Sequence, residues 1–364
     1  MRSLCSTVCK WTYRGQDGLD GQGWGASYFE SIGLGELVGS RKNTIGARLA
    51  PPGARVGQLT PRAAAELGLP ETVSVAASMI DAHAGALWSL GVDLEQGGLP
   101  RRMAVIAGTS TCHITVSEQP QFVPGVWGPY FSVVLSGMWT NEAGQSAAGA
   151  LIDRIVQGHG AYGQAKELAG GGVFALLDER LAALAADGDI TTLTAGLHVQ
   201  PDFHGNRSPI ADPTRKGALV GLGMESDIDD LARLYLATIQ ALAYGTRHII
   251  EEMKANGVDI GTIVVSGGLA KNRLYLDAHA DATGCTVLVP DQAEPVLLGS
   301  AMLGAVAAGA YPDLPQAMQA MAGSGDRISP RGRYGDFHDR KYKVFRRMQQ
   351  DFVDYKALMD SSKG

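Results

Sequence analysis

The sequence lacks the features that mark several classes of protein. Its first residues, MRSLCSTVCKWTY, hold no apolar run, so we do not expect a signal peptide. The uncharged, Ala- and Gly-rich stretch 295–312 is shorter than the roughly 20 apolar residues that a membrane span needs and predicts a buried helix. Basic residues are not in excess, since 31 lysines and arginines face 37 aspartates and glutamates. This balance argues against a nucleic-acid partner.

Cysteine is also scarce. The four cysteines, Cys5, Cys9, Cys112 and Cys285, contain no C-x-x-C pair, and their spacing matches neither a zinc motif nor a disulfide framework. We therefore expect no metal site, and a reducing, cytoplasmic location. The one dense basic cluster, Arg340–Arg347, includes apolar residues as well, which predicts an amphipathic helix with a solvated face.

Glycine, by contrast, is abundant. The 364 residues include 48 glycines, about 13% against a usual ~7%. They follow no G-X-Y period, which excludes collagen, and they lie between apolar runs, which predicts turns that approach ligands closely. The length and the 45% of apolar residues are typical of a globular chain with two domains or one large domain.

Apolar patterning predicts an α/β fold, with helices and strands that alternate along the chain. The polar stretch 94–102 is the expected domain boundary. We expect strands at 3–11, 72–80, 103–107, 111–117, 262–266 and 285–290. We expect helices near 26–39 and at 61–69, 143–157, 227–256 and from 295, with a helix-rich insert at 161–187.

Asp81 is a candidate for proton transfer. It follows the apolar run 72–80, and small residues after it leave room for a ligand. Chemistry in open α/β sheets occurs at the carboxyl ends of strands, where a carboxylate can accept a proton from a substrate hydroxyl. A helix N-cap explains the same pattern equally well. A metal-dependent hydrolase that uses Asp81 and His83 is a weaker alternative, because no further ligand has a matching spacing.

Two glycine-rich turns are candidates for nucleotide binding. Gly108-Thr109-Ser110 lies between two expected strands, and its consecutive N–H groups and hydroxyls suit a phosphate chain. An ordinary hairpin turn explains it as well. Gly267 and Gly268 follow an expected strand, where bare backbone suits an adenine ring and Asn272 is available for hydrogen bonding. A lone Gly-Gly pair is weak support.

Glu142 and Gly144 precede or open the expected helix 143–157. Gly144 would let a flat ligand approach the backbone, and Glu142 could hold a substrate hydroxyl. Equally, Glu142 could be a capping carboxylate at the positive end of the helix dipole. Arg207 lies in the polar loop 201–209, for which a solvated surface loop is the simpler interpretation.

The order of these segments resembles that of the FGGY carbohydrate kinases. Along the chain come DAHAG, GTS, EAGQS, GNRSP, SGGLAKNR, ADATG and EPVLLGSAMLGAVAAGAY. The ribulokinase-like branch is most similar, since VCKWTY, IDAHAG, EAGQSAAG and FHGNRSPIADP have near-verbatim counterparts there. The resemblance extends from residue 3 to about residue 350.

The resemblance implies a fold and an activity. Family members have two domains of the actin-like, RNase H-like ATPase type, with the active site in the cleft between them. They transfer the γ-phosphoryl group of Mg²⁺-bound ATP to a terminal hydroxyl of a sugar or polyol. For this sequence the implied substrate is a ketopentose, ribulose above all, and the implied cofactors are ATP and Mg²⁺.

The resemblance also implies roles for individual residues. Asp81 matches the family's catalytic base. Lys10 and Glu142, together with Asp81, match residues that hold the hydroxyls of a ketopentose. Seven residues match the nucleotide site: Gly108 and Thr109 at the phosphates, Gly144 and Gln145 at a helix start, and Gly267, Gly268 and Asn272 at the adenosine.

One family motif has no counterpart here. Family members begin with D-x-G-T-x-x-x-R, which grips the phosphates, and this sequence does not contain it. We therefore expect residues 1–93 to be the last part of the N-terminal, sugar-binding domain, and residues 94–364 to be the ATP-binding domain. This is the pattern of a truncated or split kinase, with a second copy or a separately encoded N-terminal half as its partner. A nucleotide-binding or interaction module without catalysis is the alternative.

Overall fold

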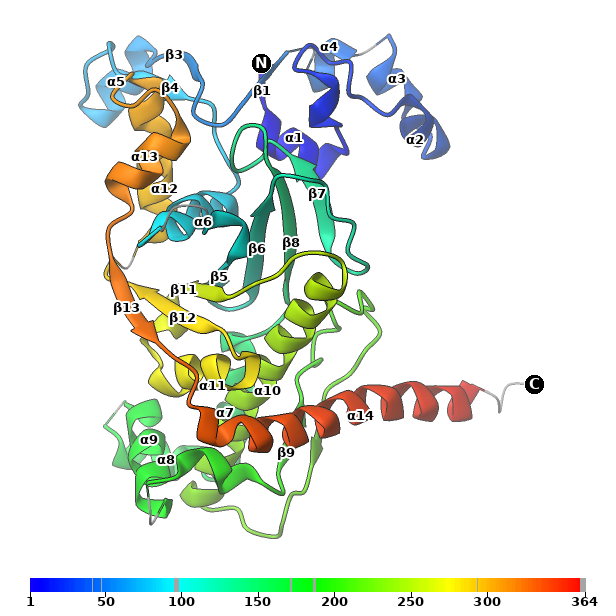
Figure 1. Cartoon of the computed structure of the whole chain (residues 1–364), viewed down its shortest axis with the longest axis vertical. Helices are drawn as coiled ribbons and strands as arrows, with labels where there is room; N and C mark the ends of the chain where they lie inside the picture. Colours follow the sequence, from blue (N-terminus) through cyan, green and yellow to red (C-terminus); the bar gives the residue numbers. More distant parts are fainter. Residues whose placement is uncertain are drawn as a thin grey trace.

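A seven-stranded mixed sheet forms the centre of the molecule (Figure 1). The computed structural model describes residues 1–360 apart from 41, 47, 95–97, 171, 186–187 and 293. The strand order is β13-β12-β11-β5-β6-β8-β7, in which β11 is parallel to β5 and β12, and the other pairs are antiparallel. The strands are β5 (Arg102–Ala107), β6 (Thr111–Ser117), β7 (Trp127–Phe131), β8 (Trp139–Gln145), β11 (Thr262–Ser266), β12 (Thr286–Pro290) and β13 (Gly325–Ile328).

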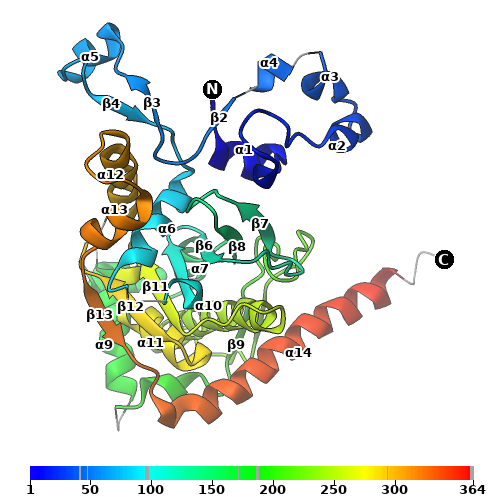
Figure 2. The same ribbon diagram turned by 45° about the horizontal axis from the view of Figure 1, so that its top comes forward.

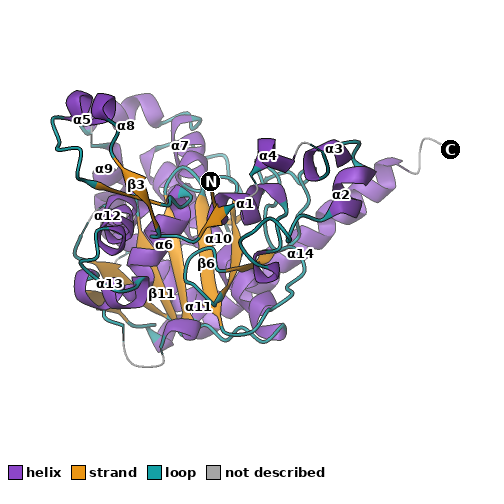
Figure 3. Ribbon diagram, turned by 90° about the horizontal axis from the view of Figure 1, so that it is seen from above, coloured by secondary structure: helices purple, strands orange, loops and turns teal. Residues whose placement is uncertain are grey.

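Helices cover both faces of this sheet (Figure 3). In β5, Met103 and Val105 belong to one apolar cluster and Ala104 to the other, as the alternation of side chains along a strand requires. The first cluster includes side chains from α7 (Gly149–Gln157), α9 (Val173–Leu184), α10 (Ile228–Ala255) and α11 (Arg273–Thr283). The second includes side chains from α1 (Leu4–Trp11), α6 (Asp81–Gly91), α12 (Pro295–Ala307) and α13 (Leu314–Met321).

Helices α6 and α12 pack closely because of one glycine. A Cβ atom at Gly299 in α12 would lie 1.9 Å from the carbonyl oxygen of Ala84 in α6. No side chain fits at that distance, so Gly299 lets the two helix backbones touch. This contact fixes α6, and with it Asp81 in its first turn, against the second face of the sheet.

The first 80 residues lie at one end of the molecule, around the amino end of α6 (Figure 2). Tyr13, Trp24 and Phe29 form a chain of edge-to-face aromatic contacts there. The elements of this part are β1 (Arg2–Ser3), α2 (Ala26–Ser31), α3 (Gly35–Val38), α4 (Lys42–Ile45), β2 (Leu49–Ala50), β3 (Arg55–Gln58), α5 (Pro61–Leu67) and β4 (Ser74–Ala76).

The remaining elements lie on the side of the first cluster. The long helix α14 extends away from the body toward the C-terminus (Figure 1). These elements are α8 (Tyr162–Leu168), β9 (His198–Gln200), β10 (Ala218–Val220) and α14 (Gly335–Asp360). Short 3₁₀ helices occur at Gly15–Asp17, Leu99–Arg101, Ile190–Thr194, Gly268–Lys271 and Gly332–Tyr334.

Three expectations about local structure are wrong. The segment 3–11 is helical from Leu4, because Leu4, Cys5 and Val8 share one buried helix face and the Ser3 hydroxyl caps the first turn. The segment 139–145 is strand β8, whose ladder to β6 continues to Gln145, so α7 begins only at Gly149. Strand β4 ends at Ala76, which puts Asp81 in the first turn of a helix instead of at a strand end.

Other expectations are confirmed. The fold is α/β, the segment around Gly108-Thr109-Ser110 is a strand–turn–strand hairpin, and Asp227 caps the long helix α10. Strands β11 and β12, the helix-rich insert, and helices α5 and α12 also lie where the sequence predicts them. The basic cluster does lie in the helix α14, although Lys341 within it is buried and donates to the carbonyl oxygens of Thr194 and Leu197.

Candidate active site

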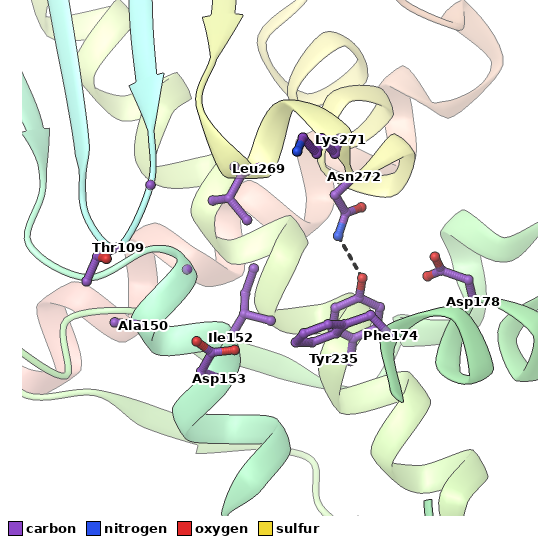
Figure 4. Close-up of a pocket in the computed structure, with 13 residues that line it drawn as sticks. Thr109, Ala150, Ile152, Asp153, Phe174, Asp178, Tyr235, Leu269, Lys271 and Asn272 are labelled. Carbon is purple, nitrogen blue, oxygen red and sulfur yellow. Dashed lines mark hydrogen bonds between the residues drawn. The ribbon is translucent and has the colours of Figure 1, made fainter. Parts of the chain in front are cut away.

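A cavity of about 540 Å³ opens between the β5–β6 hairpin turn and the helices on the first face of the sheet (Figure 4). We call it the hairpin cavity. Its walls come from the hairpin turn, the start of α7, helices α9 and α10, and the 3₁₀ turn before α11. The lining residues are Gly108, Thr109, Gly149, Ala150, Ile152, Asp153, Phe174, Asp178, Tyr235, Gly268, Leu269, Lys271 and Asn272.

Backbone contacts hold the hairpin turn against the amino end of α7. The N–H of Gly149 donates to the Gly108 carbonyl at 3.0 Å, and the N–H groups of Ala148 and Ala150 both donate to the Thr109 carbonyl. A Cβ atom at Gly149 would lie 2.8 Å from the Gly108 oxygen, so only glycine allows this approach. The Thr109 side chain is exposed, beside a helix end whose dipole favours anions.

The opposite wall is apolar and aromatic. The rings of Phe174 and Tyr235 lie 5.6 Å apart with an interplanar angle of 36°, next to Leu269. Asn272 Nδ2 donates to Tyr235 Oη at 2.7 Å, while its Oδ1 accepts from the N–H of Tyr275 and caps α11 (Figure 4). This wall therefore presents flat apolar surface with a small number of fixed polar groups, which suits a planar heterocycle.

Burial sets the charge of two groups on this wall. It raises the pKa of the Tyr235 hydroxyl, which stays protonated at neutral pH. It also raises the pKa of the Asp178 carboxyl, against the opposing effect of a hydrogen bond with Tyr235. Asp153, in the second turn of α7, lies nearer to the hairpin turn (Figure 4).

A second group of polar residues surrounds Glu142 in β8. We call Glu142, His83, Arg207, Cys5 and Cys9 the Glu142 cluster. Glu142 Oε1 accepts a hydrogen bond from Arg207 Nη2 at 2.6 Å, and its Oε2 lies 3.1 Å from His83 Nε2. Burial alone would raise the pKa of Glu142, but the hydrogen bond from His83 and the charge of Arg207 outweigh it and lower the pKa. Glu142 is thus a buried carboxylate that stays ionised.

His83 connects Glu142 to two cysteines on α1. Its Nδ1 lies 3.2 Å from the Cys5 sulfur and 4.0 Å from the Cys9 sulfur. Burial alone would lower the pKa of His83, but hydrogen bonds with Cys5 and Glu142 raise it to about 9. The hydrogen bond with Cys9 lowers the pKa of the Cys5 thiol. The Arg207 guanidinium, which donates to the other oxygen of Glu142, lies over the Trp127 ring, 4.4 Å from its centroid.

The structure separates the residues predicted to bind nucleotide into two sets. Gly108, Thr109, Gly268 and Asn272 line the hairpin cavity. Gly267, at φ 92°, lies next to this cavity. A side chain is excluded there by the neighbouring backbone, because a Cβ atom would lie 2.6 Å from the Ala107 oxygen.

Gly144 and Gln145 do not line this cavity. A Cβ atom at Gly144 would lie 2.1 Å from the Thr111 oxygen, which shows that the close pairing of β6 and β8 requires this glycine. Gln145 is buried, and its Nε2 donates to the Leu242 carbonyl at 2.7 Å. Neither residue lies at a helix start, because both belong to β8.

Of the three residues predicted to bind sugar, Lys10 and Glu142 interact electrostatically. The charge of Lys10, an exposed residue in the last turn of α1, helps to lower the pKa of Glu142. Asp81 is exposed in the first turn of α6, where its Oδ1 accepts from the N–H of Ala82. Burial raises the pKa of Cys112, whose sulfur accepts from Arg207, and the charge of Asp81 makes a smaller contribution in the same direction.

Sequence reasoning missed several residues of both groups. Phe174, Tyr235 and Asp178 line the hairpin cavity, but they come from two helices far apart in the sequence and no local motif marks them. Arg207 is an ion-pair partner with 17% of its side chain exposed, not part of a freely solvated loop. The sequence around Arg207 does not reveal this ion pair, because Glu142 lies 65 residues away along the chain.

Comparison with known proteins identifies the family. Residues 103–308 match the C-terminal domain of the FGGY family of carbohydrate kinases. The chain belongs to this family. An FGGY carbohydrate kinase domain-containing protein of Xenopus laevis is 47% identical over 98% of this chain, and the D-ribulokinase of Saccharomyces cerevisiae is 37% identical over 84% of it. The chain spans 66% of the length of the first relative and 47% of the second.

Solved structures show the fold of this FGGY chain. A ligand-bound xylulose kinase from Lactobacillus acidophilus superposes with a TM-score of 0.72 at 16% identity, over 97% of this chain and 64% of that one. A xylulose kinase from Brucella ovis gives 0.69 at 21% identity, over 93% and 63%. These likenesses confirm the actin-like, RNase H-like fold. Among the helices of the described residues, none is both long and apolar enough to cross a membrane.

Proposed function

We propose that this chain binds ATP and a ketopentose, and that it carries the residues that transfer the γ-phosphoryl group to a terminal hydroxyl of ribulose. The hairpin cavity supports nucleotide binding, since an aromatic wall faces a glycine turn at a helix start. Two relatives support the sugar class, because the Saccharomyces cerevisiae and Mycolicibacterium smegmatis proteins are named D-ribulokinase and ribulokinase.

In this proposal the adenine lies against Phe174, Tyr235 and Leu269, and the phosphates extend toward Gly108 and Thr109. The remaining N–H groups of the turn and the Thr109 hydroxyl offer donors to the phosphate oxygens. The amino end of α7, whose first N–H groups bond the turn, adds its positive dipole. Mg²⁺ would enter with the phosphates and neutralise their charge, and Asp153 is the carboxylate of the cavity that suits it.

The sugar would lie by Lys10, Glu142 and Asp81. Both oxygens of Glu142 already have partners, but each carboxylate oxygen can accept a further hydrogen bond, from a sugar hydroxyl. Lys10 offers three donors to sugar oxygens. Among the described residues, Asp81 is exposed and hydrogen-bonds only within its own helix turn, so its second oxygen is open to a substrate hydroxyl.

The proposed reaction needs one base and a positioned nucleotide. The Asp81 carboxylate accepts the proton of the terminal hydroxyl as the hydroxyl oxygen attacks the γ-phosphorus. The bond between that phosphorus and the oxygen bridging to the β-phosphate breaks, and ADP leaves with the electron pair. The chain's task is positioning and charge stabilisation, which phosphoryl transfer mainly requires.

The experiment is ATP-dependent phosphorylation of D-ribulose, L-ribulose and D-xylulose by this chain, alone and together with an N-terminal fragment of a full-length relative. We expect turnover with ribulose and a loss of at least about 100-fold in Asp81→Asn, the usual range for a general base. The exposed Glu71→Gln is the control and keeps full activity. No turnover under any of these conditions, or full activity of Asp81→Asn, would contradict the proposal.

A second candidate is nucleotide binding without phosphoryl transfer. The hairpin cavity supports it, because its lining offers a place for a nucleotide and does not include the proposed base, Asp81. Calorimetry separates the two functions. ATP binding that depends on Phe174, with no transfer to any sugar even when the N-terminal fragment is supplied, would establish this second function.

We place the protein in the cytoplasm. All four cysteines are free thiols, which suits a reducing compartment. The division into a sugar-binding part (1–93) and an ATP-binding part (94–364), and the partner, a second copy or a separate N-terminal half, stay predictions.

A further inference from the structure

Two cysteines and a histidine meet where α1 packs against α6. Cys5 and Cys9 are one helix turn apart on α1, and His83 comes from the first turn of α6. His83 Nδ1 lies 3.2 Å from the Cys5 sulfur and 4.0 Å from the Cys9 sulfur, and all three donor atoms lie within 4.8 Å of one another. Two sulfur donors and one imidazole nitrogen thus face a common point. None of these three residues lines the hairpin cavity.

The surroundings of this point are ordered and largely closed to water. Cys5 and His83 are fully buried, whereas Cys9 is half-buried. Glu142 orients the imidazole, because an ionised carboxylate can only accept, so His83 Nε2 is the donor to Glu142 Oε2. That leaves Nδ1 to face the two sulfurs. A carboxylate that holds the far nitrogen of a histidine is the usual support of a metal-bound imidazole.

The donor set selects one class of metal ion. Two sulfurs and an imidazole are poor ligands for Mg²⁺ or Ca²⁺, which take oxygen, and good ligands for Zn²⁺. Zinc binds sulfur at about 2.3 Å and nitrogen at about 2.0 Å, which in a tetrahedron puts the donors roughly 3.5–4 Å apart. The separations of 3.2 and 4.0 Å bracket this range, so small side-chain adjustments suffice.

We propose that Cys5, Cys9 and His83 form a binding site for a thiophilic divalent cation of the Zn²⁺ type, which ties α1 to α6. The fourth position is left to water, on the half-exposed side of Cys9. The cation would fix two helices that carry residues of the proposed sugar site, because Lys10 follows Cys9 and Asp81 lies two residues before His83. The site itself does not depend on ATP binding.

Cobalt(II) is the probe for the experiment, because its colour reports ligand type and geometry. The full chain is reduced, stripped with a chelator and titrated with Co²⁺ alone. We expect saturation at one equivalent, with thiolate-to-cobalt charge-transfer absorption and intense tetrahedral d–d bands, and we expect Zn²⁺ to bleach both. Zn²⁺ should also raise the thermal unfolding midpoint by a few degrees through mass action.

Single substitutions identify the ligands. Cys5→Ser, Cys9→Ser and His83→Asn should each abolish the charge-transfer band or weaken Co²⁺ binding at least about tenfold, since even the loss of an outer-shell partner costs that much. Cys285→Ser is the matched control, since Cys285 is also a buried free thiol but lies away from α1, and it should bind as the wild type does. Cys112→Ser should also keep the band.

Two results would overturn the site. One is the absence of a thiolate band in the reduced wild-type chain at excess Co²⁺. The other is a band that persists in Cys9→Ser or disappears in Cys285→Ser. Because a variant can lose stability without metal, the Zn²⁺-induced rise of the unfolding midpoint is compared with each variant's own metal-free value, and circular dichroism confirms that Cys9→Ser is folded.

Discussion

Arg207 donates a 2.6 Å hydrogen bond to Glu142, and only 17% and 7% of the two side chains are exposed. Removing one member of a buried ion pair costs about 3–5 kcal/mol, and the loss here lies at the lower end of that range because His83 still contacts Glu142. Arg207→Met should therefore lower the free energy of unfolding by roughly 3 kcal/mol. Urea denaturation measures this change in the free energy of unfolding.

A double variant tests whether the buried charge of Glu142 causes this loss of stability. Arg207→Met with Glu142→Gln removes both charges, so it should be more stable than Arg207→Met alone. Arg180→Met is the control, because Arg180 pairs with Asp229 at the surface and its loss should change little. If the double variant is no more stable than the single one, the buried charge of Glu142 is not the cause of the loss.

Gly149 positions the hairpin turn. In Gly149→Ala, the new Cβ atom would meet the Gly108 carbonyl oxygen at 2.8 Å, so the turn must shift away from α7. We expect ATP affinity to fall about tenfold, since a displacement of less than 1 Å suffices to disturb a positioned site. Calorimetry measures the affinity. Gly163→Ala in α8 is the control, because a Cβ atom there meets nothing within 4 Å, and unchanged ATP affinity in Gly149→Ala would contradict the assigned phosphate turn.

Phe174 and Tyr235 test where the base binds. Stacking of a base on an aromatic side chain contributes about 1–3 kcal/mol, so Phe174→Ala should weaken ADP binding at least about fivefold. Tyr235→Phe keeps the ring and removes only the hydroxyl that accepts from Asn272, so it should change ADP affinity much less. Fluorescence titration with ADP compares the two variants. Equal affinities in Phe174→Ala and in wild type would move the base away from this wall.

The sequence predicts elements whose determinants are local. Helix α10 is one, because the Asp227 cap and the apolar periodicity lie within the helix itself. The hairpin around Gly108 is another. The same local reasoning fails at 139–145, where the residues form a strand because β6 and β7 offer hydrogen-bonding partners on both sides. No pattern within those seven residues encodes that pairing.

The candidate site divides in the same way. The glycine turns can be found by motif, so Gly108, Thr109, Gly268 and Asn272 do line one cavity. Its aromatic wall could not be predicted, because Phe174 and Tyr235 meet only when α9 packs on α10. The contact of His83 with Glu142 spans 59 residues and depends on the docking of α6 beside β8. Tertiary packing creates these parts of the site.

Acid should destabilise the fold through a pair of buried histidines. His113 and His279 are fully buried, and Thr246 Oγ1 lies between their Nε2 atoms, at 3.0 and 3.1 Å. His279 Nδ1 donates to the Tyr275 carbonyl, so a neutral His279 accepts at Nε2 from Thr246, which in turn accepts from His113. This arrangement suits two neutral imidazoles. Burial lowers the pKa of His113 to about 3 and that of His279 to about 4.

The direction of this pH dependence follows from how many protons the folded and the unfolded states bind. In the unfolded chain these histidines titrate near pH 6.5, so below that pH the unfolded state binds protons that the folded state refuses, until about pH 4 and 3. The stabilisation is fully present above about pH 6.5 and is lost as the pH falls, by up to about 1.4 kcal/mol per pH unit for each histidine.

Urea unfolding at pH 7, 6 and 5 gives the slope of the unfolding free energy against pH for wild type and for His113→Asn. The variant should show the smaller slope whatever its stability at pH 7, while the exposed His204→Asn keeps the wild-type slope. Equal slopes for His113→Asn and wild type would mean that His113 carries its charge inside the fold.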